Sequence, residues 1–509
     1  MKLIPSNTLA STSFLLTSFA QATIFLAPED DILLPRSSSA TNPLTSLGAN
    51  SPYFTGPNVN GISNHVPENC YVDQVAYNVR HGSRYPDSGA YVQWTSLYAE
   101  IQAANFTSTG SLAFLKSWKP VLTNPTLQIA QESPTGFKEA YDLGYQLRTR
   151  YPNLYSYGEP FISWANLYPR VVQTAQNFVR GFLGSSASNL GMVVTINSTG
   201  SESALFDSLS PSDLCPSFVD GNGGAEQVTW NSIYLPPIHA RLQSLIKGNL
   251  NFSTTDVSIM PYLCGFESQI TGTLSPWCGV FTDEELKQYE YAQDLRYYYG
   301  TGPGKDLPSK MMLPYLDSLV GLLEQGPGTN GTFLNGSSYT LPSILTAFMN
   351  DGQITELGAA TGVWDDTKSL GDGKKIPHDY KYISSHFVTM RGTVAFERLN
   401  CAIPGNSTLT KSTRSAPHFY ESASSSASTN ATYIRILLND AVYPVHSCRS
   451  GPGSSCLLSD YSKLIKRKVD AAGDLPTRCN VTASGAPTTI KGASFFTDLS
   501  LPWLGTVIP

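Results

Sequence analysis

The chain has 509 residues, of which 41% are hydrophobic, so it is long and apolar enough to fold around a large core with two substructures. Its formal net charge is −6 and only 14% of its residues are charged. This balance argues against a nucleic-acid partner and against binding to an anionic membrane surface.

Residues 1–22 have the features of a secretory signal peptide. Lys2 supplies a positive start, an apolar run extends from Leu9 to Phe19, and Ala20-Gln21-Ala22 matches a small-residue cleavage pattern. No later run reaches the roughly 18 apolar residues that a membrane-spanning helix needs. We therefore expect a secreted, extracellular protein without a membrane partner. The following residues, 23–60, are rich in Ser, Asn, Pro and Gly without sustained periodicity, which predicts a flexible N-terminal arm.

The most informative segment is 75–86, with the sequence VAYNVRHGSRYP. Alternating apolar residues at 75, 77 and 79 predict a half-buried strand, which runs directly into Arg80, His81 and Arg84. Guanidinium groups bind phosphate oxygens in bidentate fashion and keep their charge. An uncharged His81 imidazole could attack phosphorus and carry the phosphoryl group. The arginines should lower the pKa of His81, because one cation disfavours another nearby.

Arg170 is a second candidate for anion binding. A strand is predicted at 161–165, and the helical run RVVQTAQNFVRGF begins at Arg170. Backbone N–H groups and a side chain can meet an anion together at such a strand-to-helix junction. The alternative is an ordinary solvated arginine.

The middle of the chain, from about 186 to 340, is predicted to be mostly helical. Candidate helices lie at 238–247, 282–299 and 310–325, separated by Gly and Pro breaks.

A second strand is predicted at 344–349, and it is followed by Asn350, Asp351 and then a helical pattern. Without further context, the tripeptide Asn-Asp-Gly would be ordinary turn material. His378-Asp379 is another pair of potential acid–base residues, but it follows a Gly/Lys/Pro-rich run that predicts a surface loop.

Cysteines and glycosylation sequons agree with an extracellular chain. The even count of eight cysteines fits four disulfides, for which the sequence alone leaves 105 pairings open. Their spacing matches no zinc site, so we expect no metal and no cofactor. Candidate glycosylation sites are Asn105, Asn197, Asn251, Asn330, Asn335, Asn406, Asn430 and Asn480.

The motif RHGSRYP resembles the nucleophile motif of the histidine acid phosphatases, and in particular their secreted fungal branch of phytases and broad acid phosphatases. The runs SPWCGVFTDEELKQYEYAQDLRYYYGTGPG and NDAVYPVHSCRSGPGSSCLL are similar to segments of that branch, and the resemblance covers residues 65–485. It implies an α/β fold, with a sheet domain of the histidine-phosphatase type at 61–185 and 341–509. A smaller, mainly helical domain would be inserted at 186–340.

The resemblance also implies a role for each candidate residue. His81 would be the phosphorylated nucleophile, Arg80, Arg84 and Arg170 would bind phosphate, and Asp351 would donate a proton to the leaving oxygen. Asn350 would assist phosphate binding where the family usually has histidine. The implied disulfides are Cys70–Cys401, Cys215–Cys479, Cys264–Cys278 and Cys448–Cys456.

Asn350 departs from the family pattern. Its amide can donate a hydrogen bond, but it is uncharged and shorter than histidine. The lost charge-assisted bond would cost about 1.5–3 kcal/mol, or roughly 10- to 100-fold in rate. We expect a slower enzyme; the alternative is a catalytically weakened phosphate- or phytate-binding glycoprotein. A phosphoryl mutase is disfavoured by the signal peptide and the disulfides.

The expected substrates are small phosphate esters. Phytases carry a lysine-rich run where this chain has residues 87–91, DSGAY, and they carry Lys-Lys where it has Arg296-Tyr297. A less basic rim binds a highly anionic ring more weakly. The sequence therefore favours a general phosphomonoesterase, and it leaves open both the use of phytate and the oligomeric state.

Overall fold

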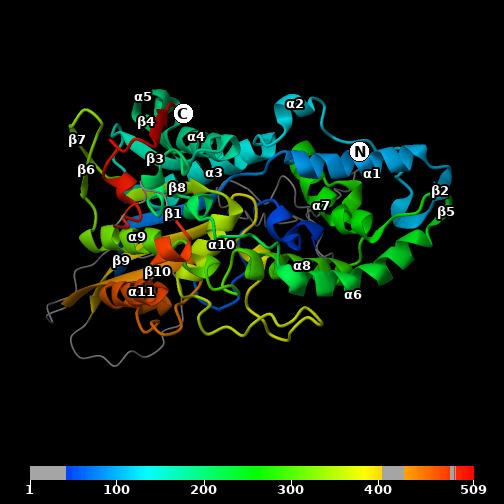
Figure 1. Ribbon diagram of the computed structural model, residues 1–509. Helices are drawn as coiled ribbons and strands as arrows, with labels where there is room; N and C mark the ends of the chain where they lie inside the picture. The colour runs from blue at the N-terminus through cyan, green and yellow to red at the C-terminus, as the bar shows by residue number, and fades with distance from the viewer. Residues whose placement is uncertain (1–41, 404–428, 482–486, 488) are drawn as a thin grey trace, which may run out of the picture.

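A computed structural model describes residues 42–403, 429–481, 487 and 489–509. Among these residues, nine strands form one sheet in the order β11-β10-β9-β1-β8-β3-β4-β13, with β12 paired to β10 (Figure 1). The strands are β1 (Cys70–Arg80), β3 (Phe161–Asn166), β4 (Gly191–Ile196), β8 (Ile344–Met349), β9 (Thr393–Ile403), β10 (Thr429–Leu438), β11 (Ala441–Val442), β12 (Cys456–Leu457) and β13 (Leu504–Val507).

The central strands β1, β8, β3 and β4 are parallel, so their carboxyl ends meet at one edge of the sheet. All six residues of β3 and of β8 are buried, as expected for parallel strands that are covered on both faces. In the register of β1 with β8, Arg80 lies opposite Met349. The residues that follow these two strands, His81 and Asn350, therefore emerge side by side.

Helices cover both faces of the sheet (Figure 1). On one face, α3 (Pro134–Arg150) and α4 (Pro169–Leu183) pack on the odd-numbered side chains of β1, such as Tyr77. On the other face, Ala76 belongs to a core that includes α9 (Leu313–Gln325), α10 (Asp351–Ala360) and α11 (Leu458–Ala472). Successive side chains of β1 therefore point alternately into two separate hydrophobic cores, one on each face of the sheet.

A helical lobe lies beyond one end of the sheet domain (Figure 1). It contains α1 (Ser88–Ala103), α6 (Gly224–Gln243), α7 (Thr254–Thr271) and α8 (Asp283–Gly300). The starts of α7 and α8 are each fixed by a capping box, Ser253 with Asp256 and Thr282 with Glu285. A two-stranded ribbon of β2 (Phe106–Ser108) and β5 (Ile246–Gly248) lies at the outer end of this lobe (Figure 1).

The predicted boundaries of the inserted domain, 186–340, are wrong at both ends. Strand β4 falls inside that range, yet it pairs along its whole length with β3 in the main sheet. Helix α9 also falls inside it, yet α9 packs against α11 beside the sheet. Conversely, α1 was assigned to the sheet domain and packs against α7 of the lobe. Whether an element belongs to the sheet domain or to the lobe depends on its packing partners, which the local sequence pattern does not reveal.

Two helical predictions in the lobe also differ from the structure. The helix expected at 238–247 begins at Gly224, ends at Gln243 and continues through Pro236 and Pro237. Helix α7 was not predicted, and it contains Pro261. Pro236, Pro237 and Pro261 thus lie inside helices, although proline usually ends or kinks a helix. Buried apolar side chains, including Tyr234 on α6 and Met260 on α7, keep these helices packed.

The predicted flexible arm, 23–60, is wrong over residues 42–54. Residues 43–45 and 48–50 form short 3₁₀ turns, and the side chains of Leu44 and Leu47 are fully buried. This segment contacts the turn 384–386 and α8. The predicted signal peptide and residues 23–41 lie outside the described residues.

The structure describes all eight cysteines, and they form the four disulfides named above: Cys70–Cys401, Cys215–Cys479, Cys264–Cys278 and Cys448–Cys456. Of the candidate glycosylation sites, Asn406 lies outside the described residues and Asn197 is half-buried. The remaining six are exposed: Asn105, Asn251, Asn330, Asn335, Asn430 and Asn480. Within the described ranges, no helix has the length and apolar character needed to cross a membrane.

Candidate active site

His81 follows the last residue of β1 and lies at the carboxyl edge of the sheet. Its backbone N–H donates to the carbonyl of Met349 at the end of β8 (3.0 Å), and its carbonyl accepts from the N–H of Arg391 (2.8 Å). The residue is only 1% exposed. Its main chain is thus fixed on both sides by neighbouring segments of the sheet domain.

The ring of His81 is oriented by the next residue. Its Nδ1 lies 2.9 Å from the carbonyl oxygen of Gly82. Because a carbonyl can only accept, Nδ1 carries the proton and Nε2 carries the lone pair. The Gly82 N–H in turn donates to the hydroxyl of Thr174 (2.9 Å), which donates to Glu132 (2.7 Å). A Cβ at Gly82 would lie 2.6 Å from Glu132 Oε1 and 2.9 Å from the backbone oxygen of Gly136, so this position favours glycine.

Arg80 is held from several directions. It is 2% exposed, and its Nη1 donates to the carbonyls of Ala49 (2.6 Å) and Val388 (2.7 Å). Its Nη2 lies 3.6 Å from Oδ2 of Asp351. The guanidinium plane is therefore set before any ligand binds.

Arg84 and Arg170 approach from other segments. Arg84 donates to the carbonyl of Tyr85 (3.0 Å) and lies over the ring of Phe266 on α7, 5.2 Å from its centroid. Arg170 stands in the first turn of α4, and its Nη2 donates to Oδ1 of Asn350 (3.3 Å). The structure therefore brings Arg170 to the end of β8, as the proposed role of this residue requires.

The pKa of His81 is lowered well below its usual value. Burial is the largest cause, followed by the positive charges of Arg170, Arg80 and Arg84. The direction agrees with the expectation from the sequence, although burial was not foreseen as the main cause. Arg170 itself has its pKa lowered to about 10 by burial and by Arg84, so it stays charged in acidic and neutral solution. These cations lie close together and favour an anionic ligand between them.

Asp351 is the first residue of α10, directly after Asn350. Its Oδ2 accepts a hydrogen bond of 2.6 Å from the hydroxyl of Tyr297 on α8. Burial acts to raise the pKa of Asp351, but the charge of Arg80 and the Tyr297 hydrogen bond outweigh it and hold the pKa well below the usual range. The side chain is 31% exposed, so solvent protons reach it.

Asn350 is the N-cap residue of α10, but its side chain does not cap that helix. Its oxygen instead accepts from Arg170, so the NH₂ end of the same amide is the donor available to a ligand. The other candidate pair, His378 and Asp379, lies on an exposed turn. Asp379 lines a separate cavity of about 240 Å³, so this pair forms no part of the site around His81.

Several groups that contribute to the site were not identified from the sequence. They are Tyr297, the carbonyls of Ala49 and Val388, and the chain from Gly82 through Thr174 to Glu132. Thr174 could have been found, because it lies four residues after Arg170 on the same helix. The others come from distant segments and have no local signal.

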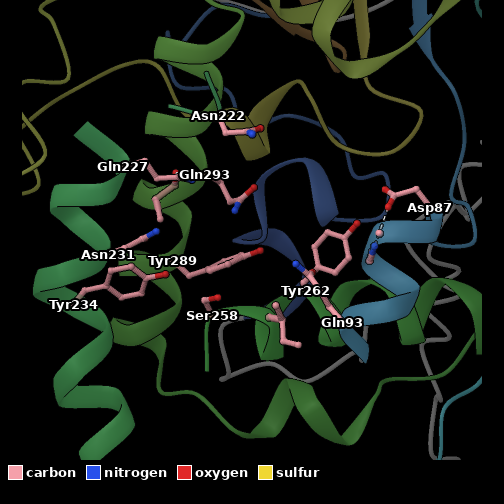
Figure 2. Close-up of a pocket in the computed structure, with 14 residues that line it drawn as sticks. Asp87, Gln93, Asn222, Gln227, Asn231, Tyr234, Ser258, Tyr262, Tyr289 and Gln293 are labelled. Carbon is pink, nitrogen blue, oxygen red and sulfur yellow. Dashed lines mark hydrogen bonds between the residues drawn. The ribbon is translucent and has the colours of Figure 1, made fainter. Parts of the chain in front are cut away.

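A cleft of about 570 Å³ adjoins these residues within the helical lobe. Figure 2 shows polar side chains from α1, α6, α7 and α8 facing the space between these helices. Asp87 lines the cleft, and its Oδ2 is 3.7 Å from Nη2 of Arg84. The cleft therefore begins one side chain away from Arg84.

Comparison with known proteins agrees with this geometry. A model of the histidine phosphatase superfamily (branch 2) matches residues 72–439. Phytase PHO112 of Candida albicans is 26% identical over 464 residues, which cover 89% of this chain and 91% of that protein. Acid phosphatase PHO1 of Komagataella pastoris is 28% identical over 485 residues, which cover 92% and 91%.

A solved structure gives the same result. The crystal structure of the phytase from D. castellii superposes with a TM-score of 0.73 at 25% identity, covering 89% of this chain and 90% of that one. The fold and the buried histidine among arginines thus define a histidine phosphatase. The chain belongs to the histidine phosphatase superfamily, branch 2, and its relatives include fungal phytases and acid phosphatases, which confirms the family expected from the sequence.

Proposed function

We propose that the protein is a secreted acid phosphatase that hydrolyses phosphomonoesters through a phosphohistidine at His81. The observation that carries this proposal is a neutral, oriented imidazole surrounded by the guanidinium groups of Arg80, Arg84 and Arg170. The relatives named phytase and acid phosphatase support the same reaction class.

In the first step, Arg80, Arg84, Arg170 and the amide of Asn350 hold the phosphate oxygens, and Nε2 of His81 attacks phosphorus. The bond between phosphorus and the ester oxygen breaks, and Asp351 donates its proton to the leaving oxygen. Asp351 is ionised without ligand, because Arg80 and Tyr297 hold its pKa low. A bound phosphate dianion offsets the nearby positive charge and raises that pKa, so Asp351 takes up a proton from solvent.

In the second step, water attacks the phosphohistidine while the Asp351 carboxylate accepts a proton from that water. The phosphorus–nitrogen bond breaks, inorganic phosphate leaves, and His81 recovers its lone pair. The carbonyl of Gly82 accepts from Nδ1–H throughout, which stabilises the phosphorylated ring.

A purely phosphate-binding role is not favoured. Phosphate binding alone would not need a proton donor, yet Asp351 is retained and is hydrogen-bonded to Tyr297 (2.6 Å). The relatives also bear the names of enzymes.

Release of phosphate from p-nitrophenyl phosphate tests the proposal. His81→Ala is expected to lower kcat by at least about 10³-fold, as for loss of a nucleophile. His378→Ala is the matched control, because it removes an exposed histidine that also precedes an aspartate, and it should keep normal activity. Equal rates for the native protein and His81→Ala, or no release by the native protein, would contradict the proposal.

Secretion is supported by the predicted signal peptide, the four disulfides and the exposed sequons. In a eukaryotic host, the protein should appear in the medium and lose apparent mass on endoglycosidase treatment. Retention inside the cell without glycans would contradict this part of the proposal.

A further inference from the structure

We propose that Glu132 is a positioning residue that acts in its protonated form: it donates a hydrogen bond to Thr174, and this one hydroxyl then holds both the Gly82 peptide and the start of α4. The inference rests on the proposed function, because Gly82 orients the ring of His81 and the first turn of α4 carries Arg170.

The main chain of Glu132 is fixed to the loop that follows β1. Glu132 forms an antiparallel bridge with Arg84, and the N–H of the next residue, Ser133, donates to the carbonyl of Ser83 (2.9 Å). Glu132 is only 1% exposed, and its Oε1 lies against Gly82. Its carboxyl group is therefore held between this loop and α4, away from solvent.

The hydroxyl of Thr174 has three neighbours at hydrogen-bond distance. They are the N–H of Gly82 (2.9 Å), Oε1 of Glu132 (2.7 Å) and the carbonyl oxygen of Arg170 (2.7 Å). A hydroxyl group offers one hydrogen and two lone pairs. The N–H of Gly82 uses one lone pair, so one hydrogen and one lone pair remain for the two oxygens.

Only a protonated Glu132 satisfies both of these oxygen contacts. An ionised Glu132 takes the Thr174 hydrogen, which leaves the hydroxyl and the Arg170 carbonyl 2.7 Å apart with no hydrogen between them. A protonated Glu132 gives its own hydrogen to Thr174, and the Thr174 hydrogen then goes to Arg170. The second carboxyl oxygen, Oε2, accepts from Nδ2 of Asn177 (3.0 Å), so the proton belongs on Oε1.

The surroundings of the carboxyl group also favour the protonated form. Burial raises the pKa of Glu132 to about 8, against the lowering effect of its two hydrogen bonds to α4, and the charge of Glu139 on α3 adds to the rise. The guanidinium groups of Arg84 and Arg170, on the two other segments that contact Glu132, are directed to α7 and to the end of β8. In acidic solution Glu132 therefore keeps its proton.

Glu139 provides a matched contrast, because its carboxyl group faces donors. It accepts from the N–H of Ser83 (2.7 Å), the hydroxyl of Ser83 (2.8 Å) and the N–H of Tyr53 (3.2 Å). In Glu132→Gln, the amide NH₂ takes the place of the protonated oxygen, and the amide oxygen takes the place of the accepting one. In Glu139→Gln, the NH₂ would face a backbone N–H in either orientation of the amide.

Infrared spectroscopy detects the proton directly. At about pH 6, which lies between the ordinary pKa of glutamate and the raised pKa of Glu132, the spectrum of the native protein minus that of Glu132→Gln should contain the C=O band of a carboxylic acid. A difference spectrum with carboxylate bands alone overturns the inference.

The denaturant midpoint of unfolding gives a second readout. Unfolded Glu132 loses its proton near its ordinary pKa and folded Glu132 only near pH 8, so native stability is lost as the pH rises between these values. Glu132→Gln has no such proton, so its midpoint should increasingly exceed the native one over this range. At about pH 5, Glu139→Gln should instead lower the midpoint, because it opposes two donors. Equal losses in both variants, without pH dependence, contradict the inference.

Hydrolysis of p-nitrophenyl phosphate tests the positioning role. Glu132→Leu keeps a side chain of similar size but donates no hydrogen bond, so its kcat at acidic pH should be about tenfold below that of Glu132→Gln. Equal kcat values for the two variants overturn the positioning role, and they leave the proposed function standing when the native protein releases phosphate. A native protein that releases no phosphate overturns both proposals. The infrared and unfolding measurements do not depend on the leucine variant.

Discussion

At His81, burial and the surrounding guanidinium groups keep the imidazole neutral in solutions where a free histidine would be protonated. Protonated His81 cannot attack phosphorus, so activity is present above its pKa and is lost as the pH falls through it. Because that pKa is lowered, the loss is displaced to acidic solution. The burial of His81 and the positions of the arginines thus predict that the enzyme stays active in acidic solution.

Arg170→Gln tests this link. Removing the positive charge of Arg170 should let the pKa of His81 rise, so the acid limb of kcat/KM should move to higher pH. The profile is compared with that of the native enzyme on one substrate, so that ionisation of the substrate cancels. Arg180→Gln, on the exposed face of the same helix, should leave the limb in place. An unshifted limb in Arg170→Gln would show that Arg170 does not face His81.

Asn350→His is expected to increase turnover. Asn350 accepts a hydrogen bond from Arg170 and, in the proposed site, would reach the phosphate through its uncharged amide, whereas histidine could supply a charge-assisted bond. The gain should be roughly 10- to 100-fold in kcat with p-nitrophenyl phosphate, which corresponds to about 1.5–3 kcal/mol. No gain would mean that the side chain at position 350 does not reach the phosphate.

At the scale of elements, the site is assembled where β1 and β8 end and where α4 and α10 begin. The parallel register of β1 and β8 brings His81 beside Asn350, although 268 residues separate them in the sequence. Helix α8 reaches the same point through Tyr297. The segment 43–54 reaches it through the carbonyl of Ala49, so the correct folding of this segment positions Arg80.

Leu47→Ala should therefore affect both stability and activity. Leu47 is fully buried, and truncation of such a side chain typically costs about 2–5 kcal/mol. The free energy of unfolding, measured with denaturant, should fall by that amount, and phosphatase activity should be lost at lower denaturant concentration. Leu127→Ala removes a side chain that is 72% exposed, so it should change the free energy of unfolding by less than about 0.5 kcal/mol. Equal, small effects at both positions would mean that residues 43–54 do not pack as described.

The site residues and buried side chains that could be predicted from the sequence are those marked by a short, local sequence pattern. His81, Arg80 and Arg84 share one short motif, and Asp351 follows a clear strand pattern, so these candidates were identified. The burial of Leu44 and Leu47 was missed, because single side chains in a Pro- and Asn-rich segment enter the core without any periodicity. In the sequence, Tyr297 stood out only because it replaces a lysine of the phytases. Its contact with Asp351 forms only when α8 and α10 pack together, so the sequence did not predict it.

At the scale of the whole molecule, two disulfides join distant parts of the chain. Cys70–Cys401 links β1 to β9 across 331 residues, and Cys215–Cys479 spans 264 residues. By contrast, Cys448–Cys456 closes a loop with a separation of only 8 residues. A longer loop restricts the unfolded chain more strongly, so the long-range bridges should contribute more to stability.

Replacing Cys215 and Cys479 together by alanine should lower the free energy of unfolding by about 2–5 kcal/mol. Replacing Cys448 and Cys456 should cost roughly 2–3 kcal/mol less, because the loop is far shorter. Denaturant unfolding under non-reducing conditions gives both values. Equal losses for the two pairs would contradict the argument from loop length.

The most direct test of the account is to trap the covalent intermediate. The enzyme is mixed with a ³²P-labelled monoester, quenched in alkali within milliseconds, and digested. We predict acid-labile, alkali-stable label in the peptide that contains His81, and none in the His81→Ala variant. A native enzyme that turns over without any labelled peptide, or that carries the label on another residue, would contradict the central claim that His81 takes the phosphoryl group.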